Sequence, residues 1–61
     1  MTNEQAKQVK TGSTIGFPGA NDTGTATVEC GIIEVHWNSG RISEFTRSML
    51  ADDDGIVLLK A

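Results

Sequence analysis

The sequence predicts an all-β domain in which five short strands roll into a small barrel, with a short helical turn before the last strand. Apolar and polar residues alternate through residues 26–45, which is typical of half-buried strands. Glycine-containing turn signals divide that stretch, which favours hairpins over helices. A chain of 61 residues forms one domain at most. We expect residues 11–61 to form this domain and residues 1–10 to form a polar N-terminal tail.

The tail carries a helix start signal but little apolar surface. Thr2 and Gln5 have the spacing of a capping box, in which each side chain bonds the backbone of the other. Ala6 and Val9 are too few to dock such a helix firmly. Because polar termini are usually poorly ordered, we expect this segment to fray.

The first strand of the domain is predicted over residues 13–17. Ile15 and Phe17 then share one face of the sheet. A dense turn signal follows at residues 18–22, where Pro presets φ and Gly and Asn tolerate positive φ. The second strand begins at Thr23 or Thr25 and runs to Glu29, and its Thr and Val content suits a pleated surface.

The register of the next hairpin follows from polarity. If Cys30 and Gly31 form a two-residue turn, apolar residues face apolar residues and polar residues face polar residues at every pair. A slip of one residue would destroy that agreement. The predicted pairs are Val28 with Ile33, Ala26 with Val35, Thr27 with Glu34, and Thr25 with His36.

The second hairpin has two alternative registers. A three-residue loop at residues 38–40 places Trp37 opposite Arg41, Val35 opposite Ser43 and Ile33 opposite Phe45. A two-residue loop instead places Trp37 opposite Ile42 and forces Glu44 inward opposite Val35. We favour the first register, in which Arg41 can cover Trp37 and Ile42 lies outside beside His36.

The remaining segment predicts a helical turn, an acidic turn and a last strand. Residues 46–50 lose the alternation and favour a single turn of the tighter, 3-10 type. Residues 51–55 contain three aspartates followed by Gly55. Residues 56–59 form an apolar run that favours a strand covered on both faces.

This order of elements resembles the Src-homology-3-like small barrel. Residues 35–40 (Val-His-Trp-Asn-Ser-Gly) are similar to the strand and turn of bacterial and phage barrels of the KOW type, and the resemblance covers residues 11–60. It implies a long loop at residues 16–24. The peptide-binding eukaryotic members carry a row of tyrosines for polyproline ligands. This chain has no tyrosine, so that activity is not expected here.

Charge and composition bear on partner and compartment. The net charge is −3, and the five basic residues form no run, which disfavours a nucleic-acid role without excluding it. No apolar run has the length of a membrane span. One free cysteine and a polar N-terminus without a signal-peptide pattern favour the cytoplasm. Because small cores are marginally stable, self-association is an open alternative to a stable monomer.

The residues that bear chemistry form no catalytic or metal-binding constellation, so we expect neither an enzyme nor a cofactor. His36 and Glu34 share a strand face, but two ligands are too few for a tight metal site. Cys30 has an acidic neighbour, which opposes thiolate formation. The three aspartates lack the alternating ligands and distal Glu of a calcium loop.

The candidate binding residues are Phe17, Trp37, Arg41 and His36. In the predicted fold, the first three and the long loop lie near one rim of the barrel, where an aromatic residue can anchor a partner. The sequence thus favours a non-enzymatic binding or accessory module that acts through protein–protein contacts. The alternative is a nucleic-acid-associated regulator of phage or plasmid type, for which the basic side chains would have to share one face.

Overall fold

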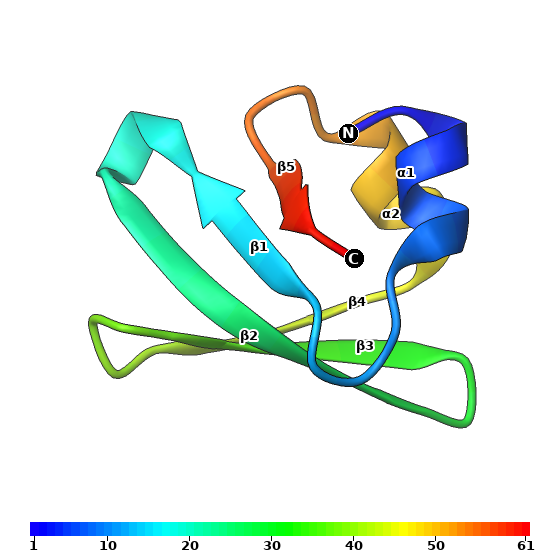
Figure 1. Ribbon diagram of the computed structural model, residues 1–61, viewed down its shortest axis with the longest axis horizontal. Coiled ribbons are helices and arrows are strands. Elements are labelled where there is room, and N and C mark those ends of the chain that lie inside the picture. The colour runs from blue at the N-terminus through cyan, green and yellow to red at the C-terminus, as the bar shows by residue number, and fades with distance from the viewer.

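The computed structural model describes residues 1–61 and is mostly β: a five-stranded antiparallel sheet with strand order β4-β3-β2-β1-β5 and two short helices (Figure 1). The strands are β1 (Thr14–Phe17), β2 (Asp22–Glu29), β3 (Ile32–Trp37), β4 (Ile42–Phe45) and β5 (Val57–Lys60). The helices are α1 (Asn3–Gln8) and α2 (Arg47–Asp52), and a 3-10 turn spans Pro18–Ala20. β4 and β5 are the two edges of the sheet and do not pair with each other.

Both hairpin registers agree with the sequence prediction. All four predicted pairs of the β2–β3 hairpin are present, including Val28 with Ile33. In the β3–β4 hairpin, Ile33 pairs with Phe45 and Val35 with Ser43, as the three-residue loop requires. The backbone N–H of Trp37 donates to the carbonyl of Arg41 across that loop, at 2.8 Å. Polarity matching set the first hairpin, and the loop length together with the exclusion of Glu44 from the interior set the second.

The core lies on the inward face of these strands and beneath the two helices. Ile33 and Val35 are fully buried, and Trp37 is 8% exposed. Ile15 from β1, Leu50 from α2 and Ile56 before β5 complete the interior. The apolar residues that alternate with polar ones along the strands thus face one interior, as predicted.

The N-terminal segment is a docked helix, and the expectation of a frayed polar tail was wrong. The capping box of Thr2 and Gln5 forms. Met1, Ala6 and Val9 are buried in the core. The Nη1 atom of Arg47 in α2 donates to the carbonyl oxygens of Ala6, at 2.5 Å, and Val9, at 2.9 Å. The sequence estimate failed because it counted local apolar residues and could not see this long-range contact.

The two helices lie together beside the open side of the sheet (Figure 1). α1 packs against α2 and β5, and α2 also contacts β4. The α-amino group of Met1 donates to the carbonyl oxygens of Leu50 and Asp53 at the end of α2. The helix pair therefore connects the two edge strands that do not bond to each other.

Three other expectations were wrong in detail. β1 and β2 remain paired up to Phe17 and Asp22, so the connection is a 3-10 turn and not a loop over residues 16–24. Residues 47–52 form an α-helix, with Thr46 as its N-cap, in place of a 3-10 turn. β5 is an edge strand, and its Leu59 is 56% exposed, so the strand is not covered on both faces.

Candidate binding site at one end of the sheet

A cavity of about 170 Å³, the aromatic pocket, lies where β1, β3 and the segment after α2 meet. It contains all three aromatic side chains of the chain, namely Phe17, Trp37 and Phe45. The other lining residues are Ala20, Asp22, Arg41, Ser43, Asp53 and Ile56. Three of the four predicted binding residues, Phe17, Trp37 and Arg41, therefore line one cavity.

Strand ends and turns position these side chains. Phe17 is the last residue of β1 and pairs with Asp22, the first of β2, across a turn that Asn21 closes in the left-handed conformation at φ 51°. Trp37 is the last residue of β3 and pairs with Gly24. Arg41 follows Gly40, whose φ of 95° suits glycine and closes the β3–β4 turn. Both turns thus lie at the same end of the β2–β3 ribbon.

Gly24 brings the aromatic residues close together. A Cβ atom at this position would lie 2.7 Å from the carbonyl oxygen of His36 and 2.8 Å from Cγ1 of Val35. Only a glycine allows this approach without displacing backbone. Gly24 was expected in the long loop or at the very start of the second strand; it lies inside β2 and pairs with Trp37, which lines the pocket.

The rings of Phe17 and Trp37 pack against each other, with centroids 6.0 Å apart and planes tilted by 48°. This offset arrangement is one that aromatic pairs prefer. The indole N–H of Trp37 donates to Oγ of Ser43 at 3.0 Å, which satisfies its polar atom and fixes the ring. Phe17 is 37% exposed, so its ring offers contact surface while Trp37 forms a wall.

The polar lining carries two carboxylates and one guanidinium. Oδ1 of Asp22 accepts from the backbone N–H of Thr23 at 2.8 Å, and Oδ1 of Asp53 accepts from that of Gly55 at 2.9 Å. Arg41 is exposed and forms no ion pair, because the one ion pair of the molecule joins His36 and Glu34. The pocket therefore combines apolar surface with charges that the protein itself leaves unpaired.

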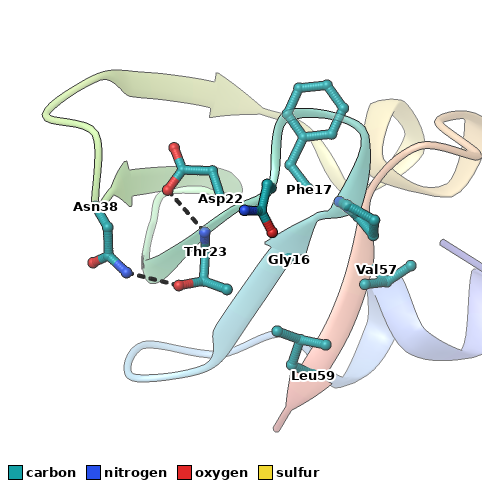
Figure 2. A pocket seen from close by; sticks show the side chains of 9 residues that line it. Gly16, Phe17, Asp22, Thr23, Asn38, Val57 and Leu59 are labelled. Atoms are coloured by element: carbon teal, nitrogen blue, oxygen red, sulfur yellow. Dashed lines mark hydrogen bonds between the residues drawn. The ribbon is translucent and has the colours of Figure 1, made fainter.

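A second hollow, of about 280 Å³, lies on the other side of Phe17, between the β1–β2 turn and β5 (Figure 2). Val57 and Leu59 flank it on one side and Asn38 on the other (Figure 2). Nδ2 of Asn38 donates to Oγ1 of Thr23 at 2.7 Å, which ties the β3–β4 turn to β2. Phe17 and Asp22, which pair across the β1–β2 turn, line both hollows.

His36 lies apart from the aromatic pocket. It follows Val35 on β3 and precedes Trp37, so its side chain points to the outer face while theirs point inward. Its Nε2 lies 2.6 Å from Oε1 of Glu34, and the imidazole is half exposed. His36 pairs with Ile42 on β4, as expected from the sequence.

The other candidate groups form no site. No three His, Cys, Asp or Glu side chains are arranged to hold a metal ion. Cys30 is exposed in the β2–β3 turn. Among the aspartates after α2, Asp53 supports its own turn through the bond to Gly55. Neither helix is long and apolar enough to cross a membrane.

Sequence reasoning missed the other six lining residues, among them an aromatic side chain and both carboxylates. The predicted register placed Phe45 on the buried face, opposite Ile33, but did not connect it with Phe17. Asp22 was assigned to a loop that the structure does not contain. Asp53 reaches the pocket through the turn between α2 and β5, and no local pattern signals that position.

No protein-family model, no curated protein and no solved structure matches this chain. A function for it therefore has to come from the geometry of its own residues.

Proposed function

We propose that the chain is a non-enzymatic binding module that engages a protein partner through the aromatic pocket. The observation that carries the proposal is the gathering of Phe17, Trp37 and Phe45, the chain's entire aromatic complement, at one end of the sheet. Aromatic and arginine side chains are enriched among the residues that dominate protein–protein binding energy. Arg41 lines the same cavity, so both residue types are present together.

The arrangement of titratable groups supports binding over catalysis. Proton transfer needs an acid or base within hydrogen-bond reach of the reacting group. His36 lies on the outer face, where its partner is Glu34, and the pocket's own titratable groups are Asp22, Arg41 and Asp53. A pocket with aromatic walls and charged residues is better suited to contact with the surface of a partner protein.

The fold type is part of the proposal. We assign the sheet to the Src-homology-3-like small barrels because β5 lies beside β1, the other strands form a meander, and a helix precedes β5. The short β1–β2 connection departs from the long loop of that superfold. This superfold serves many functions, so the pocket, and not the fold, carries the functional proposal.

Paired surface variants test the proposed function. Phe17 and Ile32 are similarly exposed, at 37% and 40%, and lie at opposite ends of the β2–β3 ribbon. Tagged wild type, Phe17→Ser and Ile32→Ser proteins are used for affinity capture from host lysate, with quantitative mass spectrometry. The expected result is a partner that wild type and Ile32→Ser retain and Phe17→Ser loses.

Size-exclusion chromatography with light scattering on the same three proteins separates a foreign partner from a second copy of the chain. An oligomer that Phe17→Ser alone dissociates would identify the chain itself as the partner. The proposed role of the aromatic pocket would be refuted if the wild-type protein were a strict monomer that retained no partner. It would also be refuted if both variants lost the partner equally.

The nucleic-acid alternative receives less support from the positions of the basic side chains. It requires Lys7, Lys10, Arg41 and Arg47 to be available on one face. Nη1 of Arg47 already donates to two carbonyl oxygens of the N-terminal segment, and the side chain is partly buried. A positively charged face formed by these residues would therefore lack one of its four members.

A further inference from the structure

We infer that the aromatic pocket receives a basic side chain, a lysine or arginine exposed on the partner protein. This inference rests on the proposed function and names the chemistry of the partner. It follows from the size of the cavity, from the faces of its aromatic rings and from the two carboxylates that line it with a single opposing charge.

The cavity is suited in size to one side chain. Its volume is about 170 Å³. Pockets that hold drug-sized molecules or cofactors are roughly 300–1,000 Å³ in volume. A single long side chain entering from a partner surface is therefore a better match than a free small molecule.

The ring faces favour a cation. The face of an aromatic ring carries negative electrostatic potential and attracts an ammonium or guanidinium group within about 6 Å. Phe17 and Phe45 are both partly exposed at the pocket, and Trp37 lies between their strands. A long basic side chain also places its methylene groups against such apolar walls, so both parts of the side chain find complementary surface.

The carboxylates add charge complementarity. Asp22 and Asp53 each use one oxygen to accept from a backbone N–H, and no group of the protein donates to the second oxygen. Arg41 is the one basic residue that lines the pocket, so two negative charges face one positive charge. Arg41 is also the more exposed of the three. The partly buried charges of the pocket are therefore the negative ones, and an incoming cation would compensate them.

Short peptides test this inference on the wild-type protein. The probes are N-acetylated, C-amidated tripeptides Gly-X-Gly in which X is arginine, lysine, citrulline or glutamate. Citrulline has the shape of arginine without its charge. Binding is followed by the fluorescence of Trp37, the only tryptophan, and by amide chemical shifts. We expect saturable binding of the arginine and lysine peptides, and binding of the citrulline peptide at least about five-fold weaker.

Variants locate the effect in the pocket. The double variant Asp22→Asn/Asp53→Asn keeps both Oδ1 acceptors, so its turns should persist, and far-UV circular dichroism checks this. It should weaken binding of the arginine peptide roughly two- to five-fold per carboxylate removed. Glu44→Gln, which alters a carboxylate outside the pocket lining on the opposite face of β4 from Ser43 and Phe45, is the matched control and should bind like wild type. Arg41→Gln should bind the basic peptides more tightly.

Several results would overturn the inference. Equal binding of the arginine and citrulline peptides, preferential binding of the glutamate peptide, or no saturable binding of any peptide would each do so. The inference would also fail if an oligodeoxythymidine shifted the same amide resonances and the arginine and lysine peptides did not displace it. Because partner capture and its loss in Phe17→Ser are measured separately, these results would leave the proposed binding role standing and would remove only its basic ligand.

Discussion

The two ends of the β2–β3 ribbon differ in what they offer to a partner. One end holds the aromatic pocket. At the other end, a shallow hollow is lined by Thr27, Ile32 and Cys30 together with three glutamates, Glu29, Glu34 and Glu44. The first end combines rings with charges of both signs, whereas the second has negative charge and no aromatic side chain. The sheet therefore has an aromatic pocket at one end and an acidic surface at the other.

The difference arises from turn geometry. The turn at residues 30–31 is a minimal two-residue connection, and the hollow beside it is lined by β2, β3, this turn and Glu44 of β4 alone. At the opposite end, the β1–β2 turn, the β3–β4 turn and the segment after α2 converge on the same cavity. Three converging connections supply side chains from distant parts of the sequence, and a single tight hairpin cannot.

The largest effect is expected from Gly24→Ala, which should disturb the base of the aromatic pocket. The new methyl group would lie 2.7 Å from a backbone oxygen, so β2 and β3 have to separate. We expect the free energy of unfolding to fall by about 2–3 kcal/mol, as for other overpacked sites. Urea denaturation measures this loss. Gly19→Ala, where the nearest atom would be 3.6 Å away, is the control and should change stability little.

The second largest effect is an expected difference in stability between alanine variants of Arg47 and Arg41. Arg47→Ala removes the donor to the carbonyls of Ala6 and Val9, so the N-terminal segment keeps only the bonds of the Met1 α-amino group as its polar attachment to α2. The expected cost is about 1–3 kcal/mol because charged, partly buried hydrogen bonds are lost. Arg41→Ala removes no ion pair and should leave the denaturation midpoint nearly unchanged. Equal losses for both variants would contradict the assignment of Arg47 to the helix pair and Arg41 to the pocket.

A substitution in the turn at residues 30–31, at the end of the ribbon that carries the three glutamates, should stabilise the protein. Cys30 has a φ of 51° and Gly31 a φ of 78°, the conformation of a type I′ turn, in which asparagine is favoured at the first position. Cys30→Asn should raise the free energy of unfolding by up to about 1 kcal/mol. Thermal denaturation under reducing conditions measures the gain. Cys30→Val, which is β-branched, should lower the melting temperature by comparison.

The smallest effect should come from the like charges on the outer face. Glu34 and Glu44 are directly paired across β3 and β4. Glu44→Lys converts this repulsion into attraction and should stabilise the fold by about 0.2–1 kcal/mol. The gain should shrink as salt is added, because the pair is solvent-exposed. A gain that is the same at low and high salt would show that charge is not its cause.

Sequence reasoning predicted the central strands because their information is local. In the first hairpin the alternation allows one register that matches polarity at every pair, and that register forms. In the second hairpin the favoured register was the one that keeps Glu44 out of the interior, and it also forms. The registers needed only the period of a strand and the chemistry of two turns. The prediction that Trp37 and Phe17 share one rim needed the barrel fold as well.

The remaining features depend on contacts between distant residues. Arg47 bonds carbonyls some forty positions away, and that contact decides that residues 3–8 dock as a helix. Asp53 reaches the pocket because the turn between α2 and β5 lies close to Phe17 at the end of β1. Leu59 is exposed because β5 lies at an edge, and a short apolar run does not distinguish an edge strand from a covered one.

The pairing of α1 with α2 has a consequence for how the chain survives partial unfolding. β4 and β5 each carry a row of backbone groups that no neighbouring strand satisfies, and such edges attract other chains. The two helices stand beside these edges and over the apolar interior (Figure 1). Detachment of the first ten residues would remove α1 from beside β5 and Met1, Ala6 and Val9 from the core, so we expect loss of this segment to favour aggregation.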